Sequence, residues 1–272
     1  MNGPSASPGS ESYDPKFFDL LDSVEDRHFW FRARRHIIRT LVRRIAAEMA
    51  PGYLALEAGC GNGSVLQALE QACPRGTVFG MDLFLEGLRY ARERTSCSLI
   101  QGDVDHLPFQ TQFDLIGCFD VLEHQADDLG VLRSIRKGLT RDGVLVLTVP
   151  AHPYLWSYFD VASCHYRRYE MGELESKLSS AGYRVEYVTH FMTSIFPLIW
   201  LRRRLNPAGK LDGTAKRADA SRLAQTELRV IPVVNSLLCF LLFQEARLIL
   251  RRRRLPLGTS LLAVARPNEA VV

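Results

Sequence analysis

Three glycines and a carboxylate lie within one short segment, Glu57 to Gly63, whose sequence is Glu-Ala-Gly-Cys-Gly-Asn-Gly. An apolar run at 53–56 precedes it, and apolar residues at helical spacing follow over 65–72, which predicts a turn from a buried strand into a helix. Glycines in such a turn let the backbone approach a ligand closely. A pyrophosphate loop is spaced Gly-x-Gly-x-x-Gly, whereas Gly-x-Gly-x-Gly with an acid two places earlier favours a ligand with a cationic part. A tight turn without a ligand is the alternative.

Two further carboxylates follow predicted strands. Residues 77–81 indicate a second strand that ends at Asp82, and residues 97–102 indicate a third that ends at Asp103. An acid after the second strand can accept both hydroxyls of a ribose, and one after the third can meet the amino edge of an adenine. A fourth strand, 113–119, leads into Asp-Val-Leu-Glu-His. One such acid alone is commonly a helix cap, but acids after successive strands indicate a nucleoside ligand.

Together these segments resemble the class I S-adenosylmethionine-dependent methyltransferases, a Rossmann-like superfamily. Besides the acids, the resemblance is carried by 57–63, by 120–124 and by a fifth strand at 143–150. It implies an α/β fold with a seven-stranded sheet in the order 3-2-1-4-5-7-6, strand 7 antiparallel, and helices on both faces. It also implies an N-terminal helical cap and a helical insertion between strands 6 and 7.

The same resemblance implies S-adenosyl-L-methionine as the methyl donor and a set of residues around it. Glu57 and the glycines would surround its methionine part, and Asp82 its ribose. Asp103 would lie at its adenine, and the backbone near Asp120 at its sulfonium. The full expected set is Glu57, Gly59, Cys60, Gly61, Asn62, Gly63, Asp82, Leu83, Gly102, Asp103, Val104, Phe119 and Asp120.

Length and composition agree with one core that carries additions. The chain has 272 residues, of which 47% are hydrophobic and 24% charged, enough to bury a sizeable core. Six cysteines without a Cys-x-x-Cys pair are expected to be reduced thiols of an intracellular protein. The expected divisions are a disordered N-terminus at 1–12, a helical cap at 13–50, a core at 51–191 plus 259–267, and a basic and apolar helical insertion at 192–258.

The cap is predicted to be an amphipathic helix over 34–49. Apolar residues recur there at helical spacing, with arginines outside the apolar stripe. The aromatic segment His-Phe-Trp-Phe at 28–31 is expected just before this helix. It is either a hydrophobic anchor for the helix or a lid over the substrate or cofactor.

A segment rich in His, Tyr, Trp, Asp and Arg follows the fifth strand, from 151 to 169. Open α/β sheets place their ligand crevice at the carboxyl ends of strands, so this segment predicts the acceptor site, with a packed structural loop as the alternative. Its Trp-Ser-x-x-Asp and His-x-Arg-Arg-Tyr motifs resemble a subgroup of methyltransferases. An oxygen or nitrogen acceptor must lose a proton, which a histidine or carboxylate can take. The candidate catalytic residues are His152, His165, Asp160, Tyr158 and His124.

Metal binding is a weaker hypothesis at this stage. Asp120, Glu123 and His124 have i, i+3, i+4 spacing, and a later histidine could complete a set of oxygen and nitrogen ligands. The same segment is common in related enzymes that need no metal. We therefore expect no metal.

The insertion at 192–258 carries 13 Lys and Arg against 4 Asp and Glu, whereas the whole chain has a net charge of only +4. Two apolar runs, 191–201 and 230–243, each precede a row of arginines. Neither run reaches the roughly 18 apolar residues of a spanning helix, so spanning is not expected. The alternatives are an interfacial helix pair on an anionic membrane surface and a helical lid with solvated arginines.

Three function classes follow. The favoured one is a methyltransferase that acts by in-line displacement on an oxygen or nitrogen, less so a carbon, of a small or lipid-like acceptor. It would be cytoplasmic, with peripheral contact at the inner membrane face as a variant. The second is a nucleic-acid methyltransferase whose insertion tracks phosphates, which is disfavoured because no RNA-binding motif is present. The third is a non-catalytic S-adenosylmethionine-binding or scaffold protein. The sequence leaves the acceptor atom and the oligomeric state open.

Overall fold

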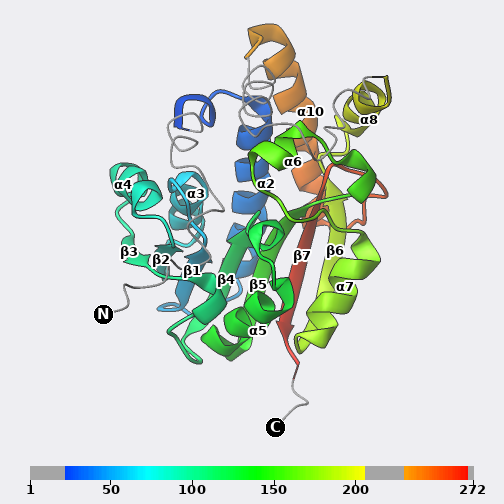
Figure 1. Cartoon of the computed structure of the whole chain (residues 1–272). Coiled ribbons are helices and arrows are strands. Elements are labelled where there is room, and N and C mark those ends of the chain that lie inside the picture. The colour runs from blue at the N-terminus through cyan, green and yellow to red at the C-terminus, as the bar shows by residue number, and fades with distance from the viewer. Residues whose placement is uncertain (1–21, 206–229, 269–272) are drawn as a thin grey trace, which may run out of the picture.

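The structure, a computed structural model, describes residues 22–205 and 230–268 (Figure 1). The N-terminal segment expected at 1–12, the start of the expected cap at 13–21 and part of the insertion at 206–229 lie outside the described residues. A single sheet forms the centre, with helices on both of its faces (Figure 1).

The sheet has seven strands in the order β3-β2-β1-β4-β5-β7-β6. The strand β7 is antiparallel to both of its neighbours, and the other adjacent pairs are parallel. The predicted α/β fold and strand order are therefore confirmed. The strands are β1 Leu54–Ala58, β2 Thr77–Asp82, β3 Ser98–Gln101, β4 Phe113–Phe119, β5 Leu139–Pro150, β6 Tyr183–Phe191 and β7 Ser260–Pro267.

The helices divide the hydrophobic core into two clusters, one on each face of the sheet. Buried side chains of α2, α3, α4 and α10 lie on one face, and those of α5 and α7 on the other. The α-helices are α2 Phe29–Ala46, α3 Ser64–Ala72, α4 Leu85–Arg94, α5 Asp128–Gly138, α6 Tyr158–Ala162, α7 Met171–Ser180, α8 Phe196–Leu205 and α10 Pro232–Leu250. Short 3-10 turns are η2 Val104–His106, η3 Leu122–His124 and η4 Pro153–Leu155.

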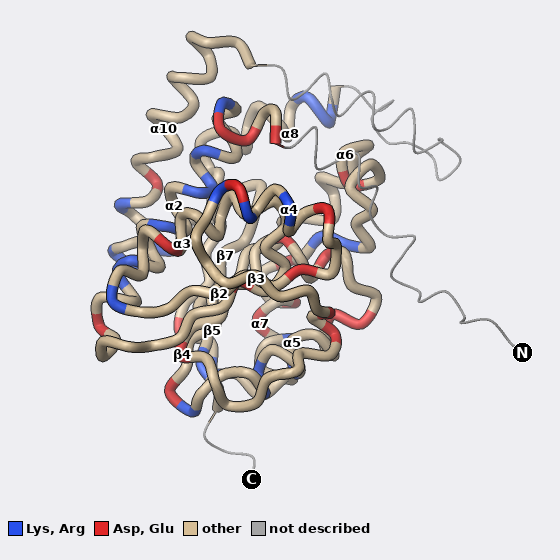
Figure 2. Tube along the Cα trace, turned by 90° about the vertical axis from the view of Figure 1, so that its left-hand side faces the viewer, with Lys and Arg blue, Asp and Glu red and all other residues tan. Residues whose placement is uncertain are grey.

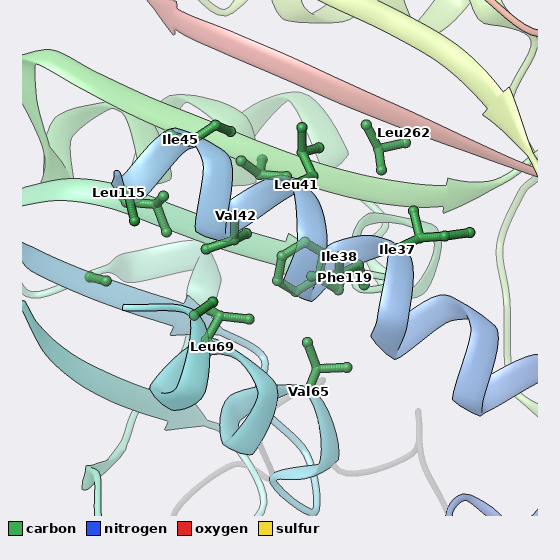
Figure 3. Close-up of a cluster of buried hydrophobic side chains, with 14 of the residues drawn as sticks. Ile37, Ile38, Leu41, Val42, Ile45, Val65, Leu69, Leu115, Phe119 and Leu262 are labelled. Atoms are coloured by element: carbon green, nitrogen blue, oxygen red, sulfur yellow. The ribbon is translucent and has the colours of Figure 1, made fainter. Parts of the chain in front are cut away.

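Helix α2 packs its apolar stripe across the sheet. Figure 3 shows Ile38 and Leu41 of this stripe among side chains of β4, β7 and α3, including Phe119. Each fully buried side chain of this size contributes about 1.5–3 kcal/mol relative to an exposed one, so the stripe fixes the helix on the core.

The start of α2 corrects one prediction. The helix begins at Phe29, and the ring of His28 caps it by accepting a hydrogen bond from the Trp30 backbone at 3.3 Å. The aromatic residues expected before the helix thus form its first turn. The histidine side chain supplies the acceptor that a helix start requires.

Helix α10 lies along α2, and polar side chains tie it to the rest of the molecule. The ring of Phe243 stacks on His36 at 4.3 Å. Asn235 accepts a hydrogen bond from the Phe29 backbone at 2.6 Å and donates one to the Arg27 carbonyl at 2.8 Å. The interactions place the beginning of α10 beside the beginning of α2.

Helix α10 is longer than the apolar run 230–243 of the sequence. The helix has 19 residues, and its most apolar stretch of 18 has a mean hydropathy of 1.7, with 33% of that stretch buried; by length and composition alone it could cross a membrane. The uninterrupted apolar run still ends at Phe243, so the prediction that this helix does not span a membrane is not tested by its length. Within the added turns Glu245 is buried, and its carboxylate accepts hydrogen bonds from the backbone of Thr193 and Ser194.

Candidate active site

The glycine segment forms the predicted turn between β1 and α3. Gly59, Gly61 and Gly63 have φ values of 81°, 52° and 80°, in the left-handed region that favours glycine. A Cβ on Gly59 would lie 2.4 Å from Cγ2 of Val121, and one on Gly63 would lie 2.7 Å from Cα of Ala91. Both the backbone conformation and the space therefore require glycine.

Asp82 lies at the end of β2 and holds this turn in place. Its carboxylate accepts hydrogen bonds from the backbone N–H of Gly61 at 2.7 Å and of Phe84 at 2.9 Å. Burial raises the pKa of Asp82, although these N–H groups oppose the shift. Each oxygen keeps a further lone pair, so the side chain can also accept from ribose hydroxyls.

The predicted adenine side is built on the next strand. The Gly102 N–H donates to the Asp82 carbonyl at 3.0 Å, which places the end of β3 beside the end of β2. Asp103 caps η2 by accepting from the Asp105 N–H at 3.0 Å, and Val104 is buried. The exposed side chain of Leu83 follows Asp82 directly. The acids predicted for ribose and adenine thus lie on neighbouring strand ends.

Glu57 is the buried acid of the glycine segment. It is 2% exposed, and its Oε2 has no hydrogen-bond partner among the residues that the structure describes. Burial raises the pKa of Glu57 well above its ordinary value; Arg34 opposes this shift, whereas Asp82 and Glu25 add to it. A buried carboxyl oxygen without a partner, close to two further acids, fits the cationic methionine part of S-adenosylmethionine.

Two residues of the N-terminal region join this site without having been predicted. Arg34 of α2 donates to the Phe119 carbonyl at 2.9 Å and forms an ion pair with Asp120 at 2.5 Å. Glu25 is buried and accepts from the Asn62 amide at 2.8 Å. The N-terminal region thereby contacts the donor side at two places, the glycine turn through Glu25 and the end of β4 through Arg34 of α2. In sequence, Arg34 is one of several arginines around α2, and no spacing distinguishes it.

On the acceptor side, Asp160 brings together much of the segment that follows β5. It is fully buried and accepts from the Ser157 N–H at 2.8 Å and from Arg168 Nε at 2.7 Å. Its Oδ1 lies 3.0 Å from Nδ1 of His165. Burial raises the pKa of Asp160, but the charge of Arg168 and the contacts of His165 outweigh it and hold the pKa well below its ordinary value.

His165 also faces η3, where a polar cluster forms that consists of buried Glu123 and the half-buried His124 and His165. Ligand-type atoms of Glu123, His124 and His165 all lie within 4.8 Å of one another. Burial and nearby Asp120 raise the pKa of Glu123 well above its ordinary value. Burial, with a smaller contribution from His165, lowers the pKa of His124 to about 3. The Tyr166 N–H donates to the Glu123 carbonyl at 2.7 Å and holds the two segments together.

The other two candidate catalytic residues have different neighbours. His152 stacks on His190 at 4.9 Å and lies 3.4 Å from a Glu170 oxygen. The Tyr158 hydroxyl accepts from Arg202 of α8 at 3.4 Å. The structure therefore joins Asp160, His165 and His124 into one constellation and places His152 and Tyr158 in contact with β6 and α8.

Comparison with known proteins agrees with this arrangement. Residues 56–147 match the family described as "Methyltransferase domain". An uncharacterized protein of Methanocaldococcus jannaschii is 27% identical over 136 residues, which are 49% of this chain and 50% of that protein. A ubiquinone biosynthesis O-methyltransferase of Actinobacillus pleuropneumoniae is 33% identical over 105 residues, 35% of this chain and 44% of that enzyme. The matches span half or less of the length of both relatives.

A longer match and two solved structures complete the comparison. A Mycobacterium tuberculosis protein named as a probable S-adenosylmethionine-dependent methyltransferase is 26% identical over 191 residues, 67% of this chain and 66% of that protein. A TehB-like S-adenosylmethionine-dependent methyltransferase from Corynebacterium glutamicum has a TM-score of 0.51 at 18% identity and covers 95% of this chain and 98% of its own.

The second solved structure contains the demethylated donor. It is a Haemonchus contortus phosphoethanolamine-type N-methyltransferase in complex with S-adenosylhomocysteine, with a TM-score of 0.53 at 18% identity, and it covers 93% of this chain and 60% of its own. At these identities the structures show the fold alone. The family match and the fold agree: residues 56–147 match a methyltransferase domain, the sheet has the strand order of the Rossmann-like class I fold, and S-adenosylmethionine as the donor is consistent with both.

Proposed function

We propose that this protein transfers a methyl group from S-adenosylmethionine to an oxygen or nitrogen of a lipid-like acceptor at a membrane surface. The observation that carries the acceptor class is a set of exposed apolar side chains on α8 and on the first turns of α10. Figure 1 shows these elements, together with α6 of the acceptor segment, at one end of the molecule.

On the donor side, S-adenosylmethionine supplies an electrophilic methyl group on a sulfonium. In our proposal the partnerless oxygen of Glu57 accepts from the ammonium group of the donor, and Asp82 accepts from its ribose. Arg34 holds the backbone at Phe119 and Asp120, which borders the sulfonium. Alignment of acceptor, methyl carbon and sulfur then supplies much of the rate acceleration.

On the acceptor side, the cluster of Glu123, His124 and His165 would accept the proton that the acceptor loses. An imidazole that donates its Nδ1–H to Asp160 has Nε2 free as an acceptor, and in this chain Nε2 of His165 points toward Glu123 at 4.0 Å. A hydroxyl or amine bound at this cluster can therefore lose its proton as the bond to the methyl carbon forms. Tyr158 and His152 would line the acceptor path next to α8.

The exposed apolar surface fits insertion into the boundary between headgroups and acyl chains. Helix α10 carries no charged residue before Glu245, and Figure 2 shows its outer turns without blue or red segments. The three arginines 202–204 end α8 beside its exposed leucines, as expected for contact with anionic headgroups. The exposed residues of this surface are Leu198, Trp200, Leu201, Leu205, Ile231, Val233, Val234, Leu237, Phe240 and Leu241.

Contact with the membrane surface fits the structure of α10 better than spanning does. Asn235 and Glu245 are both buried, and both hydrogen-bond to other parts of the protein. A spanning arrangement would place both polar groups in hydrocarbon unless these contacts persisted. We therefore propose a peripheral protein on the cytoplasmic face of the membrane.

The acceptor class is tested with labelled S-adenosylmethionine and fractionated cell extract. Label in the lipid fraction supports the proposal. Label confined to nucleic acid would overturn the proposal in favour of a nucleic-acid methyltransferase. Label confined to water-soluble small molecules would show that the acceptor is not a lipid. Donor binding by calorimetry without transfer to any fraction would favour a non-catalytic protein.

Membrane contact has its own test, cosedimentation with vesicles that contain anionic phospholipid. Leu237→Glu with Phe240→Glu should reduce the bound fraction at least ~10-fold, because two apolar anchors are replaced by charges that anionic lipid repels. Leu85→Glu is the control, since Leu85 is also an exposed apolar residue but begins α4. Equal binding by the wild type and the double variant would exclude this surface as the contact.

A further inference from the structure

We propose that Glu123, His124 and His165 bind one divalent transition-metal cation beside the donor site. The three side chains converge from two segments, η3 and the loop after α6. This inference departs from the expectation that the protein holds no metal. The cation site stands on geometry alone, and only its catalytic consequence rests on the proposed function.

The spacing of the three side chains is close to that of a coordination shell. Their ligand atoms lie within 4.8 Å of one another, and Nε2 of His165 is 4.0 Å from Oε1 of Glu123. Bonds of about 2.0–2.2 Å to a central cation would place neighbouring ligand atoms roughly 3–3.5 Å apart. Side-chain rotations that close the cluster by about 1 Å are sufficient. At 4.0 Å, Nε2 of His165 and Oε1 of Glu123 are too far apart for a hydrogen bond to each other.

The surroundings orient both imidazoles as metal ligands require. His165 has Nδ1 at 3.0 Å from the Asp160 carboxylate, which leaves Nε2 for the cluster. His124 hydrogen-bonds to the backbone of Ser163, so one of its ring nitrogens is also engaged outside the cluster. Metal-binding histidines commonly donate their second ring N–H to a carboxylate or a backbone carbonyl in this way.

An independent observation points to a ligand at the same place. Glu123 is 1% exposed, and its Oε2 has no hydrogen-bond partner within the described parts of the chain. Buried polar atoms are almost always paired with protein, water or an ion. Asp120, whose charge also acts on Glu123, is already paired with Arg34. A cation at the cluster would give the Glu123 carboxylate its missing partner.

The ligand set indicates the class of cation. Two imidazoles and one carboxylate suit Zn²⁺, Co²⁺, Fe²⁺ or Mn²⁺, whereas Mg²⁺ and Ca²⁺ prefer sites made of oxygen atoms. The cysteines 118 and 164 are close in sequence, but neither belongs to the cluster. Three protein ligands leave a coordination position open, which is typical of a catalytic site.

The open position gives the cation a role in the proposed reaction. With the cation bound, Nε2 of His165 would be a ligand and would no longer accept the proton. An acceptor hydroxyl bound at the open position would have a lower pKa, so its O–H bond breaks and the proton passes to solvent. The oxygen then bonds to the methyl carbon as the bond from carbon to sulfur breaks, which leaves the methylated acceptor and S-adenosylhomocysteine. Neither oxidation nor reduction is involved.

The test uses the full chain, stripped with a chelator and titrated with Co²⁺ and Zn²⁺. We expect one cation per chain and visible Co²⁺ absorption of a low-coordinate site. Glu123→Gln and His165→Gln should each weaken binding at least ~10-fold. His165→Cys should add a band from thiolate to cobalt, which identifies position 165 as a ligand directly. His106→Gln is the control, because His106 is exposed in η2 and outside the cluster.

The outcomes separate this inference from the proposed function. Wild-type protein that binds S-adenosylmethionine but neither cation would overturn the site, as would equal Co²⁺ affinity in Glu123→Gln and His106→Gln. Donor binding by each variant, measured by calorimetry, shows that it is folded. Cation binding without methyl transfer would leave the site in place and remove the proposed reaction. Methyl transfer by wild-type protein that binds neither Co²⁺ nor Zn²⁺ would leave the proposed reaction in place and overturn the cation site.

Discussion

The donor and acceptor sides of this molecule are held by different kinds of interaction. The donor side consists of turns that follow β1, β2, β3 and β4, and its main features are positive φ angles and backbone N–H groups at Asp82. The acceptor side consists mainly of the long segment after β5, and its main features are ion pairs to two buried carboxylates, Asp160 of this segment and Asp128 of α5.

This difference predicts that the two sides tolerate change differently. Short turns fixed by glycine geometry leave little freedom, since the donor is the same for all acceptors. A segment held by side-chain contacts can exchange residues without moving the sheet. We therefore expect substitutions on the donor side to abolish binding of the donor, and substitutions on the acceptor side to change turnover.

The largest effect is expected at Gly59. Gly59→Ala would place a methyl group 2.4 Å from Val121 at a φ of 81°, so the turn must move. We expect S-adenosylmethionine affinity to fall at least ~100-fold, equivalent to about 2.7 kcal/mol, as measured by calorimetry. Gly52→Ala is the matched control, because Gly52 has a φ of 90° but nothing within 4 Å of the added methyl group.

The Gly52→Ala variant separates the effect of backbone strain from the effect of the steric clash with Val121. Gly52→Ala should lower the stability of the fold by about 1 kcal/mol and leave donor affinity unchanged. If both variants lost donor affinity equally, the loss would come from general destabilisation and the glycine turn would not be special. Chemical denaturation of both variants supplies the comparison.

A second, smaller loss is expected on the acceptor side. Asp160→Asn removes the charge that orients His165 and pairs with Arg168. We expect turnover to fall about 10²–10⁴-fold, while donor affinity changes by less than about threefold. Methyl transfer to the labelled acceptor fraction measures the first quantity, and calorimetry measures the second.

Exposed Asp142 provides the control for this variant, since Asp142→Asn changes the same charge on the surface of β5. It should leave both quantities unchanged. A loss of donor affinity in Asp160→Asn as large as the loss of turnover would show that the two sides are not independent.

Much of the donor side could be predicted from the sequence because its residues are neighbours in the chain. The strand ends and the glycine turn depend on local patterns, and the sheet order then brings Glu57, Asp82 and Asp103 to one edge. By contrast, the roles of Arg34 and Glu25 depend on where α2 lies on the sheet. An arginine on the polar face of a helix gives no local sign that it reaches the end of β4.

On the acceptor side, the sequence indicated the residue types but gave only part of their grouping. The capping box at Ser157 and Asp160 is local, whereas the approach of His165 to Glu123 depends on how the segment after β5 folds back onto η3. The same limitation applies to α10. Past Phe243, the carboxylate of Glu245 accepts hydrogen bonds from backbone N–H groups of the segment just before α8. Hydropathy alone does not reveal such hydrogen bonds.

The smallest expected effect concerns acid stability, and it differs in sign between the two sides. Burial raises the pKa of Asp128, but hydrogen bonds from Lys177 and Tyr169 and the charge of Arg167 outweigh it and hold the pKa below its ordinary value. This carboxylate therefore stabilises the fold above the unfolded pKa of about 3.9, and the contribution is lost as the pH falls through the folded pKa. Glu57 has the opposite shift, so its contribution to stability is lost as the pH rises.

Asp128→Asn should accordingly lower the free energy of unfolding by about 1–3 kcal/mol at neutral pH. The difference from the wild type should shrink toward zero in acid, because the wild-type carboxyl then loses its charge as well. Glu57→Gln should instead stabilise the chain in the absence of donor, increasingly so as the pH rises, since it removes a buried group that resists ionisation. Urea unfolding of both variants across a pH series measures the two trends. Parallel trends would contradict the view that acceptor-side charges support the fold while donor-side charges await a cationic ligand.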